Sequence, residues 1–160
     1  MGHPERPDRL RACVSALESC EFFHELNLLS PRSATESELA WIHSQKHIEH
    51  VRSVCASGGG YLDPDTSVCL ESYDIALKSA GAWLDGVDEV IAGNSAFVLS
   101  RPPGHHAEAD RAMGFCLFSN AALAAVYALK QSTINTVAIF DWDVHHGNGT
   151  QNIVKSNPDI

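Results

Sequence analysis

Apolar residues recur at the spacing of amphipathic helices in four stretches of the chain, about 7–18, 45–56, 73–84 and 121–130. In the first stretch, Leu10, Cys13 and Leu17 are three or four residues apart and therefore share one face of a helix. Thr35 followed by Glu38 has the sequence of a capping box, which predicts another helix start at that point. We therefore expect a chain rich in helix.

Two short apolar runs, 95–100 and 137–141, are typical of strands buried on both faces of a parallel sheet. The helix expected at 121–130 lies between them, so the three elements should form a right-handed β-α-β unit with parallel strands. Residues 57–66 are rich in glycine and in other turn-forming residues, which predicts a loop. The expected fold class is α/β, with a parallel sheet flanked by helices.

The second apolar run changes abruptly into a polar segment that contains Asp141, Asp143, His145 and His146 and continues into glycines. If the chain stays extended to His145, then Asp141, Asp143 and His145 point to one side, because side chains alternate along a strand. Ligands collect at the carboxyl ends of strands in open α/β sheets. Carboxylates with imidazoles suit zinc, iron(II) or manganese. We interpret the segment as a metal site rather than as a polar loop.

His105 and His106 follow the other expected strand, after the rigid lead-in Arg101-Pro-Pro-Gly104. Parallel neighbours bring their carboxyl ends to the same edge, so this pair should lie near Asp143 and its neighbours. A divalent ion would polarise a carbonyl and activate water, and one imidazole would transfer protons. The pattern predicts metal-assisted hydrolysis; the alternative is a pair of solvated loop residues.

Three further histidines, His43, His47 and His50, have helical spacing. No motif places carboxylates beside them, so we interpret them as a solvated or partly packed helix face, not as metal ligands.

Composition narrows the possible functions. With 160 residues and 44% hydrophobic content, the chain is about one soluble domain long. A net charge of −9 argues against general nucleic-acid binding and suits a basic partner. The five cysteines show no C-x-x-C spacing, which indicates free thiols in a reducing, intracellular compartment, cytoplasm or nucleus. No apolar run approaches the length of a membrane span, and no secretory signal is recognisable.

The motifs R-P-P-G-H-H-A, M-G-F-C and D-W-D-V-H-H-G-N-G-T-Q resemble those of the zinc-dependent histone deacetylase family, specifically its class II-like members. The opening H-P-E-R-P-D-R-L is also similar to that family. The resemblance runs nearly end to end, and it implies the arginase/deacetylase fold, a three-layer arrangement with a parallel sheet. It also implies a substrate class: the acetylated lysine side chain of a histone-like protein or peptide.

The resemblance implies a role for each matching position. Asp143 and His145 match two zinc ligands, and together with Asp141 they also match a structural potassium site. His105 and His106 match the catalytic pair, with His106 as general base and acid.

Two further matches lie behind the catalytic histidines, and two lie in the substrate channel. Asp141 matches the carboxylate behind His105. Asn148 stands behind His106, where class I members have aspartate. Gly114 and Phe115 match the narrow channel that holds the acetyl-lysine stem.

The resemblance also has limits. The family's catalytic domain is about twice as long, and its third zinc ligand and the tyrosine that polarises the substrate carbonyl match no residue here. We therefore expect residues 1–160 to be the N-terminal half of such a domain, incomplete, with exposed apolar surface, and inactive or very weak alone. Two alternatives stay open: an amidohydrolase for acetylpolyamines or other small N-acyl amines, and a non-catalytic binding module of the same fold. Arginase-like manganese hydrolases share the architecture, but their further ligands are missing.

Overall fold

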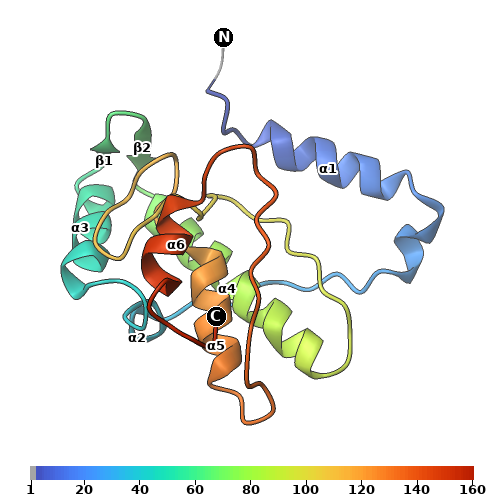
Figure 1. The fold of residues 1–160 in the computed structure, drawn as a ribbon. Coiled ribbons are helices and arrows are strands. Elements are labelled where there is room, and N and C mark those ends of the chain that lie inside the picture. The colour runs from blue at the N-terminus through green and yellow to red at the C-terminus, as the bar shows by residue number, and fades with distance from the viewer. Residues whose placement is uncertain (1–2) are drawn as a thin grey trace.

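The structure, a computed structural model, describes residues 3–160. Its elements are shown in Figure 1. The helices are α1 (Asp8–Glu18), α2 (Glu36–Leu39), α3 (Gln45–Ala56), α4 (Ser72–Ile91), α5 (Asn120–Leu129) and α6 (Asn148–Val154), with a 3-10 helix η1 (Glu21–Glu25). The strands are β1 (Gly59–Asp63) and β2 (Thr66–Cys69).

The four amphipathic stretches form helices as predicted. Helix α3 begins and ends at the expected residues, and the Ser44 hydroxyl accepts a hydrogen bond from His47 N–H at its start. The capping box before α2 is present, because the Thr35 hydroxyl accepts from Glu38 N–H and the Glu38 carboxylate accepts from Thr35 N–H. Helix α1 buries no residue completely, so its apolar face is only partly covered.

The hydrophobic core lies between α3, α4 and α5. Its fully buried side chains include Ile48, Leu84, Phe118 and Leu123, and each contributes about 1.5–3 kcal/mol of burial free energy. Helix α4 carries Gly81 where the backbone of Arg32 crosses it, and a Cβ at this position would lie 2.0 Å from the Arg32 carbonyl oxygen. The small residue therefore allows the segment before α2 to pack directly on α4.

Residues 57–66 do not form the predicted loop throughout. Strands β1 and β2 pair as an antiparallel hairpin, with Gly59 opposite Cys69 and Tyr61 opposite Ser67. A Cβ on Gly59 would lie 2.4 Å from the Val68 carbonyl oxygen, so glycine serves here for close strand approach. The prediction was wrong because a glycine-rich run reads as a loop unless the partner strand is known.

The strands predicted at 95–100 and 137–141 are extended but unpaired in residues 3–160, where the β1–β2 hairpin is the only sheet. The expected β-α-β ladder is therefore absent from the described residues. Segment 131–147 leaves α5, runs back across the molecule and turns into α6 (Figure 1). Its one backbone bond to a distant residue, from Val137 N–H to the Asp159 carbonyl, is 2.8 Å long. A local sequence can favour an extended backbone, but a strand also needs a neighbour to accept its hydrogen bonds.

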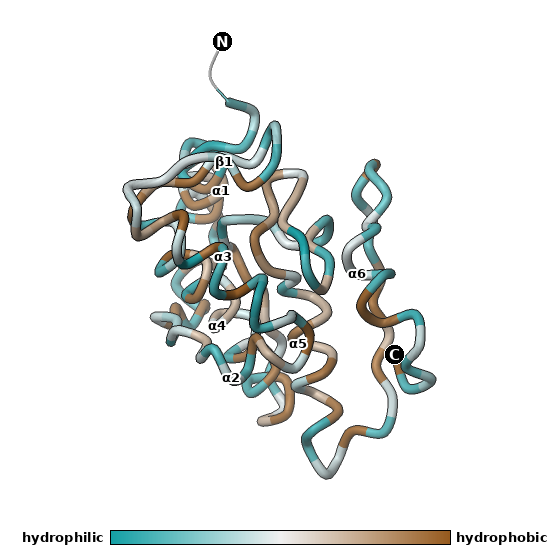
Figure 2. The backbone as a smooth tube through the Cα atoms, turned by 90° about the vertical axis from the view of Figure 1, so that its left-hand side faces the viewer, coloured by the Kyte–Doolittle hydropathy of each residue, from teal (hydrophilic) through white to brown (hydrophobic). Residues whose placement is uncertain are grey.

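These segments are also more exposed than the buried strands that we expected. Phe97, Phe140, Trp142 and Val144 are between 81% and 93% exposed, which matches the expectation of exposed apolar surface. Figure 2 shows segment 131–160, with its alternating hydropathy, along one side of the molecule. No helix in the described part of the chain is long and apolar enough to cross a membrane.

The three histidines at helical spacing are not alike. His43 and His47 are buried, and His50 is exposed. Burial, helped by the neighbouring His47, lowers the pKa of His43 to about 3, so His43 is neutral. His43 and His47 are therefore packed side chains of the fold, and His50 is solvated.

Candidate active site

His105 and His106 lie side by side, with ring centroids 4.0 Å apart, and each ring has a partner from the segment that follows 137–140. Nδ1 of His105 lies 2.9 Å from Oδ2 of Asp141. Nδ1 of His106 lies 2.7 Å from Oδ1 of Asn148, the first residue of α6. Carboxylate and amide oxygens only accept hydrogen bonds, so both rings donate from Nδ1 and leave Nε2 unprotonated when neutral.

The candidate metal ligands from the sequence, Asp141, Asp143 and His145, form a compact turn beside the histidine pair. His145 N–H and the His145 ring both lie within 2.9 Å of Asp143 Oδ1, and the Asp143 N–H donates to Asp141 Oδ1. The His145 ring centroid is 6.1 Å from that of His106. The backbone N–H of His145, followed by its ring, holds the pKa of Asp143 below its usual value. The two segments separated in sequence therefore meet at one place.

Two glycines allow the close packing around the histidine pair. Gly114 has a φ of +56° and lies against the His106 ring, so that a Cβ there would be 2.4 Å from His106 Cδ2. Gly149 lies against the backbone of Ala107, where a Cβ would be 2.3 Å from the carbonyl oxygen. Its N–H donates to the His105 carbonyl, which joins α6 to the histidine loop.

Phe115 stands next to this pair in an uncommon backbone conformation, with a φ of +68°. Its N–H donates to Thr66 Oγ1 over 3.0 Å, and its ring contacts His3 edge to face at 4.7 Å between centroids. Thr66 is buried on the β1–β2 hairpin. Gly114 therefore lies against the His106 ring, and Phe115, the next residue, is held by the hairpin; their assignment to a substrate channel stays a prediction.

Several residues that support the site were not predicted. Glu108 accepts a hydrogen bond from Asn148 Nδ2, and Glu5 forms a buried ion pair with Arg101 ahead of the histidine pair. Glu5 lies inside the H-P-E-R-P-D-R-L motif and Glu108 directly follows R-P-P-G-H-H-A, so their position in or beside a motif was the available signal. Thr66 carried no signal, because its role depends on the hairpin. Helix α6 was missed because Gly147, Asn148 and Gly149 read as a turn.

The donor set of Asp143 and His145, an oxygen and a nitrogen ligand, has the chemistry that zinc accepts. His146, in contrast, lies against Gln151, with Nε2 2.8 Å from Oε1. Within residues 3–160, no group of three or more histidine, cysteine or acidic side chains is placed to hold a metal ion. Asp143 and His145 therefore fit zinc in the type of their donor atoms, and they are fewer than the three protein ligands that a catalytic zinc needs.

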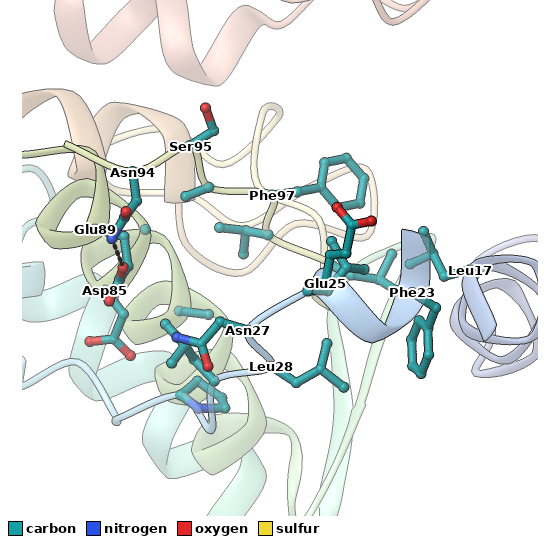
Figure 3. Close-up of a pocket in the computed structure, with 18 of the residues that line it drawn as sticks. Leu17, Phe23, Glu25, Asn27, Leu28, Asp85, Glu89, Asn94, Ser95 and Phe97 are labelled. Atoms are coloured by element: carbon teal, nitrogen blue, oxygen red, sulfur yellow. Dashed lines mark hydrogen bonds between the residues drawn. The ribbon is translucent and has the colours of Figure 1, made fainter. Parts of the chain in front are cut away.

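A groove of about 930 Å³ lies elsewhere in the molecule, between the α1–η1 region, helix α4 and residues 94–99. Figure 3 shows its apolar lining, with Leu17, Phe23, Leu28 and Phe97 around it. Neither His105 nor His106 is among its lining residues. The groove is therefore separate from the histidine site.

Comparisons with known proteins agree with this geometry. The profile of the Histone deacetylase domain matches residues 3–160. An uncharacterized protein of Synechocystis, slr0245, is 47% identical over 99% of the chain and 53% of its own length. A histone deacetylase-like amidohydrolase of Pseudomonas aeruginosa is 40% identical over 99% of the chain and 42% of its own length.

The crystal structure of the HDA15 HD domain superposes with a TM-score of 0.90 at 39% identity, over 98% of the chain and 45% of that structure. The chain thus spans about half the length of the relatives it matches. That superposition covers nearly the whole chain, although 95–100 and 137–141 form no strand ladder within residues 3–160. The chain therefore belongs to the histone deacetylase family of hydrolases and has the arginase/deacetylase fold, in part.

Proposed function

We propose that this chain carries the histidine half of a zinc-dependent lysine deacetylase, which hydrolyses the N-acetyl-lysine amide of histones or other proteins. The observation that supports this most is the pair of histidines, 4.0 Å apart, each donating from Nδ1 to its own partner. This arrangement leaves the Nε2 atoms of both rings free to accept a proton, and a positioned imidazole of this kind can act as general base and then as general acid in amide hydrolysis.

The chain's residues divide the work in this proposal. His106 takes a proton from the attacking water at Nε2 and later gives one to the leaving amine. His105, held by Asp141, provides a second polarised imidazole at the same place. Gly114 and Phe115 hold the aliphatic stem of the acetyl-lysine.

Asp143 and His145 would hold zinc, together with ligands outside this set. When bound, zinc polarises the acetyl carbonyl and acidifies water. Asp141, Asp143 and His145 would also contribute to a structural potassium site. The net charge of −9 suits a lysine-rich substrate protein.

The test is hydrolysis of an acetylated histone peptide by the protein at its native length, with N-acetylated polyamines as the competing substrate class. We expect activity on the peptide that is abolished by a chelator and restored by zinc. His106→Ala should lower kcat by roughly 10²–10⁴-fold. Preference for the polyamine would reassign the substrate, and a zinc-loaded protein that cleaves neither substrate would overturn the proposal.

The 160-residue chain by itself provides a second test. With Asp143 and His145 as its only proposed ligands, it should bind well under one zinc per chain after dialysis and cleave no acetyl-lysine peptide. Tight binding of one zinc, or peptide hydrolysis that a chelator abolishes, would show that this chain supplies a third ligand.

A further inference from the structure

The Asn148 side chain is the partner of the proposed base, and an amide can face that partner with either of two groups. If its oxygen faces His106, the ring must carry its proton on Nδ1, and Nε2 is free to accept one. If its NH₂ group faces His106, the ring must accept at Nδ1 and carry its proton on Nε2. Only the first arrangement leaves a base at Nε2.

The surroundings of the amide select between these two arrangements. Asn148 Nδ2 lies 3.0 Å from Glu108 Oε1 and 3.5 Å from Met113 Sδ. A carboxylate oxygen and a thioether sulfur are both acceptors. Turning the amide over would place its oxygen against two groups that cannot donate, so Nδ2 stays on this side and Oδ1 faces His106 at 2.7 Å.

Glu108 is itself held in place by the buried histidine that precedes α3. The Ser119 N–H donates to His43 Nε2 over 3.0 Å, so His43 carries its proton on Nδ1. That Nδ1 lies 2.9 Å from the Glu108 carbonyl oxygen and donates to it. The Glu108 N–H donates to the Arg111 carbonyl over 2.9 Å. The backbone of Glu108 is therefore fixed on both sides.

We propose that Glu108 is a positioning residue that sets the tautomer of His106 through the Asn148 amide. This inference rests on the proposed role of His106 as a base, but its direct observable, the position of one ring proton, requires neither substrate nor metal. It also gives the buried His43 a function: this side chain fixes the loop from which Glu108 reaches Asn148.

The test is the ring nitrogen spectrum of His106 in ¹⁵N-histidine-labelled protein, at about pH 8.5, where histidine is ordinarily neutral. His106→Asn assigns the signal. We expect a protonated Nδ1 and an unprotonated Nε2 in the wild type and in Glu108→Gln, whose amide oxygen still accepts from Asn148. Glu108→Leu removes the acceptor and should give a mixture of both tautomers.

Asp110→Leu is the matched control, because it removes an exposed carboxylate two residues away and should leave the tautomer unchanged. A wild-type ring protonated at Nε2, or a Glu108→Leu protein with the wild-type tautomer, would overturn the inference. If the wild-type protein has the expected tautomer but no deacetylase activity, only the proposed function is overturned.

A second test reverses the hydrogen bond between the side chains at positions 148 and 108. This test remains possible even if the Glu108→Leu protein does not fold. Asn148→Asp places a second carboxylate against Glu108, and the two repel. Adding Glu108→Gln supplies an amide that donates to the new aspartate. The double variant should therefore have a kcat roughly tenfold above that of Asn148→Asp alone. Equal or lower kcat in the double variant would contradict the contact.

Discussion

Glu5 and Arg101 form a bidentate ion pair across 96 positions of the sequence, with nitrogen–oxygen distances of 2.7 and 2.8 Å. The Glu5 side chain is only 7% exposed. The pair joins the start of the chain to the loop that leads into His105 and His106. Burial by itself raises the pKa of Glu5, but the hydrogen bonds and positive charges of Arg101 and Arg9 together keep that pKa below its usual value.

Removal of this ion pair should weaken the attachment of the N-terminal residues to the loop that leads into His105 and His106. We expect Glu5→Ala to lower the free energy of unfolding by about 1–3 kcal/mol, because the Arg101 guanidinium loses its charged acceptor. Asp8→Ala is the control: its pairs with Arg6 and Arg11 are solvent-exposed and should cost under about 1 kcal/mol. Urea denaturation measures both, and an equal loss in the two variants would contradict a special role for Glu5.

Gly114→Ala should damage catalysis more than stability. Its new Cβ would lie 2.4 Å from His106 Cδ2, so the ring must leave the position in which its Nδ1 bonds Asn148. We expect kcat to fall by roughly 10²-fold at native length. Gly93→Ala has the same type of unfavourable backbone, with a φ of +95°, but meets nothing within 4 Å. It should lose about 1 kcal/mol of stability and keep its kcat.

Thr66→Val should disturb the position of Phe115, one of the two residues proposed to hold the acetyl-lysine stem. The variant keeps the shape of the side chain but leaves the Phe115 N–H without its acceptor at 3.0 Å. We expect a loss of about 1–2 kcal/mol in unfolding free energy and a raised KM for an acetyl-lysine peptide. Thr66→Ser keeps the hydroxyl and should behave like the wild type in KM. A normal KM in Thr66→Val would separate Phe115 from substrate binding.

Glu38 makes stability depend on pH in the acid range. Hydrogen bonds from Arg32 lower the pKa of Glu38 to about 2 from the ordinary 4.5. A carboxylate with a depressed pKa stabilises the fold fully above the unfolded pKa, and that stabilisation is lost as the pH falls from about 4.5 towards 2. The difference in unfolding free energy between wild type and Glu38→Gln should therefore shrink by about 2 kcal/mol from pH 6 to pH 3.

Arg32→Gln removes the partner of Glu38 and provides the matching comparison. Its difference from the wild type should shrink over the same pH interval, because the same ion pair is missing. Differences that are equal at both pH values would show that the Arg32–Glu38 pair does not carry the acid sensitivity.

The helices and the candidate site residues could be predicted from local sequence. The spacing of apolar residues is enough to identify the buried face of α3 and α4. The Thr35–Glu38 capping box is enough to predict the start of α2. The histidine pair and the D-x-D-x-H segment were predicted to meet, and the contacts of His105 with Asp141 and of His106 with Asn148 confirm that they do. Their assignment as catalytic residues and zinc ligands stays a prediction.

Other features exist only through contacts between distant residues. The sequence assigns Gly59 to a loop, and only the contact with Val68 shows that it belongs to a strand. The sequence leaves His43 either solvated or partly packed, and only its contacts with Glu108 and Ser119 show that its ring is enclosed. Residues 95–100 and 137–141 have the composition of strands, but hydrogen-bond partners, not composition, make a strand. Local patterns set backbone preference and side-chain periodicity; the burial and pairing of those side chains depend on the neighbours that the folded chain provides.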